Sequence, residues 1–133
     1  MSTHRSLSLV TGILLGALAL GACPQKSPLA ENPAGGPEEE LFQEGLALYD
    51  AVPPDFAAAQ AKFDELVASY PDSERADNAA YLAGRCRYQL DLFADAITAL
   101  SAMRAAWPAS PFLSSAAYFT GRSRFELLSY AEA

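Results

Sequence analysis

Two arginines, each flanked by aromatic residues at helical spacing, are the side chains of this sequence best suited to binding chemistry. The two groups share the spacing i, i+4, i+7 and lie 37 residues apart: Tyr81, Arg85 and Tyr88, then Tyr118, Arg122 and Phe125. On a helix this spacing puts three side chains on one face. A guanidinium binds a carboxylate through two parallel N–H donors, while aromatic rings hold apolar side chains. The pattern predicts a groove that binds an acidic or C-terminal protein segment.

A third set on the corresponding face of an earlier segment extends the predicted groove. It consists of Phe42, Leu46 and Tyr49. A second interpretation of all three sets is structural. The aromatic side chains would pack against the neighbouring unit of the fold, and the arginines would pair with nearby carboxylates, for which the candidates are Asp77, Asp91 and Glu126. The residues alone leave both interpretations open.

Histidine and cysteine are too scarce for the common catalytic and metal-binding arrangements. The chain of 133 residues has one histidine, His4, and two cysteines, Cys23 and Cys86. His4 lies in a segment predicted to be removed, so Ser-His and Cys-His catalysis and histidine-ligated metal sites are excluded. A lone thiol such as Cys86 is typical of a small apolar core residue. We therefore expect a protein that is not an enzyme and that has no cofactor, metal site or small-molecule substrate.

The first 22 residues have the features of an export signal. Arg5 precedes an uncharged apolar run at residues 7–20, which has the length of a signal sequence rather than of a membrane span. Leu20, Gly21 and Ala22 then lead into Cys23. This ending resembles the bacterial lipobox, and the resemblance implies a lipid anchor on Cys23. A secretory signal cut before an ordinary thiol is the alternative.

Residues 23–37 are predicted to form a tether between the anchor and the folded part. From residue 24 onward this stretch has four prolines, two glycines and no aromatic residue, so it cannot bury a core. After residue 22 the chain keeps eight basic and 16 acidic residues, a net charge of −8. Such an acidic protein is not expected to bind nucleic acid.

An internal repeat with an offset of 37 residues runs through residues 38–133. The matched pairs that define it include Phe56 and Phe93, Ala59 and Ala96, Phe63 and Leu100, and Pro71 and Pro108. Alanine, the best helix former, accounts for 27 residues, which favours packed helices over sheet. We predict an all-α fold of antiparallel helix pairs, with helices at 38–50, 55–69, 74–89, 93–106 and 111–127. A sixth helix is expected to begin near Ser129, which gives about two and a half units and a third unit that is truncated.

Small, aromatic and terminal proline positions in these units resemble the tetratricopeptide repeat signature. The residues that carry the resemblance are Gly84, Phe93, Ala96, Leu100 and Pro108, with Gly121, Tyr130 and Ala133 as partial matches. Together with the lipobox, the short tether and the Tyr-Pro-Asp-Ser turn at residues 70–73, they look like the BamD family of outer-membrane barrel-assembly lipoproteins. The unit beginning at Asp77 is just as similar to the repeat domain of the YbgF/CpoB family, which works with the Tol-Pal system.

These resemblances imply a location and a role. We expect a lipoprotein anchored in the bacterial outer membrane through Cys23, facing the periplasm, whose repeats bind protein or peptide segments during β-barrel assembly. The alternative is a Tol-Pal-associated coordinator of envelope integrity and cell division. The lipobox and the short distance from Cys23 to the first repeat favour the first role, because the YbgF/CpoB family usually has a coiled-coil region before its repeats and lacks a lipid anchor.

Overall fold

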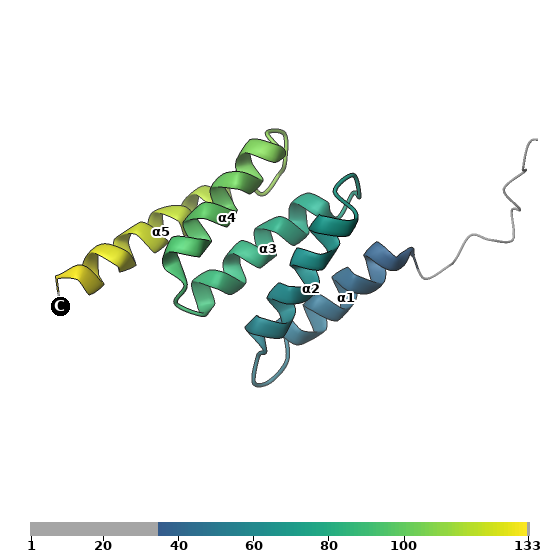
Figure 1. Cartoon of the computed structure of the whole chain (residues 1–133), viewed down its shortest axis with the longest axis horizontal. Helices are drawn as coiled ribbons and strands as arrows, with labels where there is room; N and C mark the ends of the chain where they lie inside the picture. The colour runs from purple at the N-terminus through teal and green to yellow at the C-terminus, as the bar shows by residue number, and fades with distance from the viewer. Residues whose placement is uncertain (1–34, 133) are drawn as a thin grey trace, which may run out of the picture. The chain divides into compact units, whose positions relative to one another are not determined.

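A computed structural model describes residues 35–132, which form five helices without a strand in that range. The helices are α1 (Pro37–Tyr49), α2 (Phe56–Ser69), α3 (Ala76–Gln89), α4 (Phe93–Ala106) and α5 (Leu113–Ala131). Each helix packs against the next along the chain, and α3 also contacts α5. Figure 1 shows α1, α3 and α5 in one row and α2 and α4 in another. The predicted all-α class is confirmed.

Helix boundaries recur at the offset predicted from the sequence. The helices α2 and α4 begin at Phe56 and Phe93 and end at Ser69 and Ala106, 37 residues apart at both ends. The start of α3 at Ala76 and that of α5 at Leu113 have the same separation. Helices 37 residues apart therefore take equivalent places in the two rows.

The core lies between the rows and uses the small residues of the repeat. Ala59 of α2 and Ala96 of α4 have no exposed surface. Gly45 of α1 faces the ring of Phe63, and Gly84 of α3 faces Leu100, so a methyl group at either glycine would overlap its neighbour. These positions let the helices approach closely.

The turns before α3 and α5 each contain a serine that bonds within the turn, but neither serine caps its helix, and both helices begin later than expected. The Ser73 hydroxyl accepts the backbone N–H of Arg75 at 3.1 Å, and the Ser110 hydroxyl accepts that of Phe112 at 3.2 Å. The predicted starts at 74 and 111 are each two residues too early. Pro111 lies in this turn, so its expected place at the first helical position is wrong.

The expected sixth helix near Ser129 is also wrong, because α5 continues through Ala131. At the corresponding point, two residues after the end of α3, Asp91 has the left-handed conformation, at φ 60°, and the N–H of Leu92 donates to the carbonyl of Arg87 at 2.9 Å. Aspartate tolerates this conformation, whereas most other residues with side chains do not. The residue 37 positions later is Leu128. The helix therefore has no equivalent stop signal.

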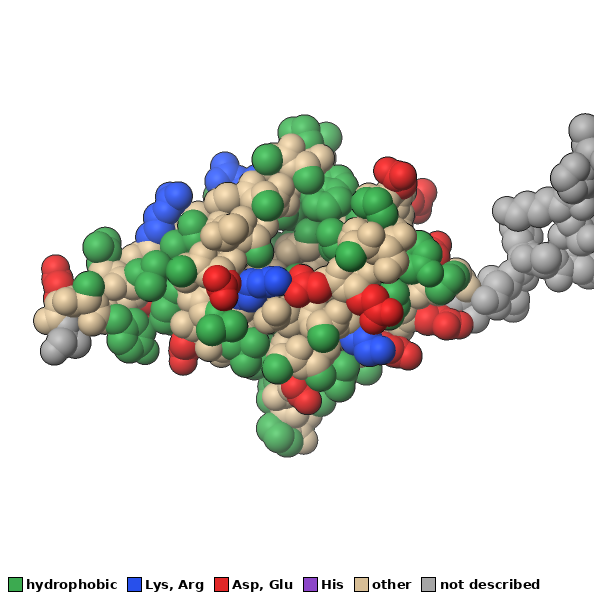
Figure 2. Space-filling model, in the orientation of Figure 1, with side chains coloured by type: hydrophobic (Ala, Val, Ile, Leu, Met, Phe, Trp, Pro, Cys, Tyr) green, Lys and Arg blue, Asp and Glu red, His purple; other side chains and the backbone are tan. Residues whose placement is uncertain are grey.

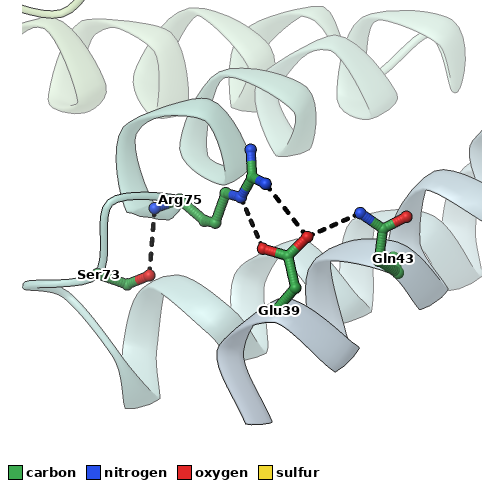
Figure 3. Close-up of polar contacts among 4 residues, drawn as sticks. All are labelled: Glu39, Gln43, Ser73 and Arg75. Carbon is green, nitrogen blue, oxygen red and sulfur yellow. Dashed lines mark hydrogen bonds and ion pairs between the residues drawn. The ribbon is translucent and has the colours of Figure 1, made fainter. Parts of the chain in front are cut away.

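An ion pair between Arg75 and Glu39 connects the turn before α3 to α1 (Figure 3). The guanidinium donates to both carboxylate oxygens of Glu39, at 2.7 and 3.2 Å, and Gln43 donates to the same carboxylate at 2.8 Å. The guanidinium also lies 4.9 Å from the ring centre of Phe42. The bond from Arg75 holds the pKa of Glu39 below its ordinary value. Glu39, in the acidic first turn of α1, therefore helps to hold α1 against the start of α3.

Several predicted segments lie outside the described residues. They are the signal at 1–22, the lipidated Cys23 and the tether up to residue 34. Within residues 35–132, no helix combines the length and the apolar character that crossing a membrane requires.

Candidate functional site

Arg85 of α3 lies among aromatic rings that come from three helices. Its guanidinium carbon is 5.4 Å from the ring centre of Tyr49 in α1, 5.7 Å from that of Tyr81 in α3 and 5.0 Å from that of Phe119 in α5. The negative faces of such rings attract a cation at these distances. We call Arg85, Tyr49, Tyr81 and Phe119 the Arg85 cluster.

Arg85 differs from most basic side chains of the described residues because it contacts no carboxylate among them. Lys62, Arg75, Arg87 and Arg122 each pair with an acidic side chain, at 2.7 to 3.2 Å. Arg104 and Arg124 also have no acidic partner in that range, but they are exposed. Arg85 is half-buried, and its Nε is fully buried without a hydrogen-bond acceptor in residues 35–132. A buried donor left unpaired costs about 1–3 kcal/mol.

Packing fixes the rings of the cluster. Tyr81 is stacked on Phe112 with ring centres 5.3 Å apart, and Tyr49 meets Phe56 edge to face at 5.3 Å. Burial raises the pKa of the Tyr49 hydroxyl, and the charge of Arg85 opposes part of this effect. Because each ring has a second aromatic neighbour, the cluster is held in place before any ligand binds.

Tyr88, also predicted for the groove, borders the cluster without contacting Arg85. Its ring meets Phe93 at 5.6 Å and Phe119 at 5.3 Å, both edge to face. Packing against the neighbouring unit, the structural interpretation of the aromatic residues, therefore holds for Tyr81 and Tyr88. The same interpretation of Arg85 is wrong within the described residues, since it pairs with none of the expected carboxylates.

The other predicted groove residues lie elsewhere. Phe42 is buried against Phe63, so it belongs to the core between α1 and α2, and Leu46 packs against that core. Tyr118 and Phe125 are exposed. Arg122 donates to Glu126 at 3.2 Å, which is one of the pairs expected in the structural interpretation. A single continuous groove through all nine residues is therefore wrong for this structure.

Sequence reasoning missed the two rings that α5 and its preceding turn contribute. Phe119 completes the Arg85 cluster, and Phe112 stacks on Tyr81. They escaped notice because their repeat equivalents are Leu82 and Arg75, which are not aromatic. Their spacing with Ala116, at i, i+4 and i+7, would have revealed the buried face of α5.

The opposite face, formed by α2 and α4, has an apolar hollow of about 310 Å³. Its lining includes five alanines of α3 and α4, together with Met103 and Trp107. Figure 2 shows green side chains flooring the hollow between the two helices. The hollow has no convergent set of polar groups beyond the Arg87–Asp64 ion pair, so it offers little chemical selectivity.

Neither metal chemistry nor a reactive thiol is evident in residues 35–132. No group of three histidine, cysteine or acidic side chains there has a spacing suited to a metal ion. Cys86 is fully buried, and burial raises the pKa of its thiol to about 12. The expectation that Cys86 is a core residue agrees with its position.

Comparison of the chain with models of known protein families, with curated proteins and with solved structures found no match.

Proposed function

We propose that this chain is a tetratricopeptide-like scaffold that binds an extended protein segment carrying a carboxylate. The observation that carries the proposal is Arg85, a half-buried cation among three rings with no acidic partner in residues 35–132. The 37-residue recurrence of helix boundaries supports the repeat architecture. No catalytic step is part of this function.

The chemistry of the Arg85 cluster favours a protein segment as ligand. A carboxylate would give the guanidinium the charged partner that residues 35–132 do not supply, with hydrogen bonds worth about 1.5–3 kcal/mol. The rings of Tyr49 and Phe119 would contact the apolar side chains next to that carboxylate. A C-terminus or an acidic side chain in an extended segment supplies both groups.

The cellular setting proposed here is the bacterial envelope. Its support is the lipobox-like ending at Cys23 and the short proline-rich stretch that follows. Lipid anchoring in the outer membrane would place the helices at the periplasmic surface, where they would bind segments of envelope proteins during β-barrel assembly. The Tol-Pal-associated role is the second candidate, and it rests on the resemblance of the unit that begins at Asp77.

Peptide binding tests the proposal. Random ten-residue peptides with free C-termini are selected on the full chain by display, and a selected peptide is then synthesised in free and amidated forms and with each acidic residue neutralised. We expect Arg85→Gln to weaken binding of the free peptide by about tenfold or more, because one charged contact is lost. Added salt should reproduce part of that loss.

Arg104→Gln is the matched control, because Arg104 is an exposed arginine of α4 outside the Arg85 cluster. It removes the same charge and should leave the affinity unchanged. If Arg85→Gln binds like the parent while only its melting temperature falls, Arg85 is a packing residue and the proposal is wrong. Equal losses in both variants would indicate attraction by overall charge.

A further inference from the structure

The residue one helical turn after Arg85 is the neutral Gln89, and this residue type affects whether Arg85 can bind a ligand. Side chains four residues apart on a helix are neighbours, with Cβ atoms about 5–6 Å apart. A carboxylate at residue 89 would therefore lie within reach of the Arg85 guanidinium. Gln89 is the last residue of α3 and is exposed, so burial in the core does not dictate its identity.

The equivalent positions of α5 show what a carboxylate does there. Arg122 is the equivalent of Arg85, and Glu126 is the equivalent of Gln89, each 37 residues later. Nη2 of Arg122 lies 3.2 Å from a carboxylate oxygen of Glu126. Both side chains belong to one helix, so this pairing depends on no neighbouring helix. A carboxylate one turn after the arginine therefore occupies the guanidinium.

The acidic side chains nearest to Gln89 along the chain and at the end of α1 do not occupy Arg85. Asp50 directly follows α1, and Asp91 lies two residues after α3. Both are exposed, and neither forms an ion pair with Arg85 in the part of the chain that the structure describes. Residue 89 is therefore the position from which a carboxylate would reach Arg85 within its own helix.

Gln89 also contacts the Arg85 cluster through Tyr49. Burial raises the pKa of the Tyr49 hydroxyl, whereas the charge of Arg85 and a hydrogen bond with Gln89 lower it. The Tyr49 hydroxyl is therefore close to both side chains of α3. This contact places the side chain of residue 89 beside the cluster rather than away from it.

We propose that Gln89 is a specificity-determining residue of the Arg85 cluster, because its neutral side chain leaves the guanidinium unpaired in the free chain and open to the carboxylate of a ligand. This inference rests on the proposed function. A carboxylate at residue 89 would pair with Arg85 as Glu126 pairs with Arg122, and a ligand would have to displace it. A group held one turn away acts at a high effective concentration, so the ligand would compete poorly.

Titration of an introduced carboxylate in the full chain tests the inference without a ligand. Glutamate is labelled with carbon-13, and the carboxyl signal that appears in Gln89→Glu is followed by nuclear magnetic resonance as the pH is lowered. It should titrate at a lower pH in Gln89→Glu than in Gln89→Glu combined with Arg85→Gln, because a paired guanidinium stabilises the charged form. Titration at the same pH in both variants would show that residue 89 does not reach Arg85, and the inference would be wrong.

Binding of a selected peptide with a free C-terminus is the second measurement. Gln89→Glu should raise the dissociation constant by about tenfold or more. Gln89→Met is the neutral variant of similar length, and it should bind as the parent does. Ser101→Glu adds the same charge at an exposed residue of α4 and should also leave the affinity unchanged. Residues 89 and 101 are both exposed, so we expect all three variants to keep the circular dichroism of the parent.

The outcomes separate this inference from the proposed function. Unchanged binding in Gln89→Glu would overturn the inference alone. So would an equal loss in Gln89→Met, which would mean that Gln89 itself contacts the ligand. A parent chain that binds no such peptide would contradict the proposed function and the inference with it, even where the titration shows pairing with Arg85.

Discussion

Arg85 and Arg122 occupy equivalent repeat positions, yet their surroundings give them different chemistry. Arg122 is exposed and pairs with Glu126 in the next turn of α5. Arg85 is followed four residues later by Gln89, which offers no charge, and it lies under rings from α1 and α5. Among the helices that the structure describes, α3 is the one with rings from both α1 and α5 at its arginine. Its arginine is therefore the one suited to binding.

Ser123 offers a test of packing at a single residue. It is fully buried, and its hydroxyl has no hydrogen-bond partner within residues 35–132. Ser123→Ala removes an unpaired polar group and should raise the free energy of unfolding by about 1 kcal/mol, measured by urea denaturation. Ser110→Ala is the contrast, since Ser110 bonds to Asp77 and to the N–H of Phe112 and its loss should destabilise. Equal shifts in both variants would contradict this account.

Cys86 should be chemically inert in the folded protein. Burial raises the pKa of its thiol from 9.0 to about 12, and the thiolate is the reactive form. Iodoacetamide at mildly alkaline pH should leave Cys86 unmodified until urea unfolds the chain, as read by peptide mass spectrometry. Because the folded pKa is the higher one, the stabilising contribution is complete below pH 9.0 and decreases as the pH rises towards 12. Rapid labelling without urea would contradict the buried placement.

At the scale of helices, the sequence predicted what depends on periodic spacing. The offset of 37 residues located α2 and α4 to within one residue, because Phe56 and Phe93 begin helices of equal length. It failed at the end of α5, where one residue, Leu128 in place of Asp91, removes the left-handed stop. It also failed at Phe119, which contacts Arg85 of α3. The repeat pattern compares residues 37 apart and does not show which side chains of α3 and α5 meet. The complete Arg85 cluster could therefore be identified only from the structure.

Ala96 tests the contact between helices within a unit. It is fully buried in α4, whereas Ala94, two residues earlier on the same helix, is exposed. Ala96→Trp should lower the free energy of unfolding by about 1–3 kcal/mol through overpacking, and Ala94→Trp should have little effect. Both are measured by urea denaturation followed by circular dichroism. Equal midpoints for the two variants would mean that α4 packs through a different face.

At the scale of the whole molecule, the proposed anchor determines where the helices act. Lipidation of Cys23 is predicted from the sequence Leu20-Gly21-Ala22-Cys23 after an apolar run. Mass spectrometry of protein extracted from bacterial membranes should find diacylglycerol on Cys23 and no residue before it. Two or more acyl chains hold a protein stably on a bilayer. A product that is free of lipid and begins at another residue would show that Cys23 is not a lipid anchor.

The most direct test of the central claim is the nuclear magnetic resonance signal of the Arg85 Nε–H group. This donor is buried and has no acceptor in residues 35–132, so its signal reports on any carboxylate that reaches the guanidinium. On addition of a selected peptide with a free C-terminus, we predict a saturable shift of this signal together with those of the Tyr49 and Phe119 rings. The amidated, charge-neutralised peptide should leave them unchanged. Saturable shifts confined to α2 and α4, with the Arg85 signal unmoved, would contradict the account.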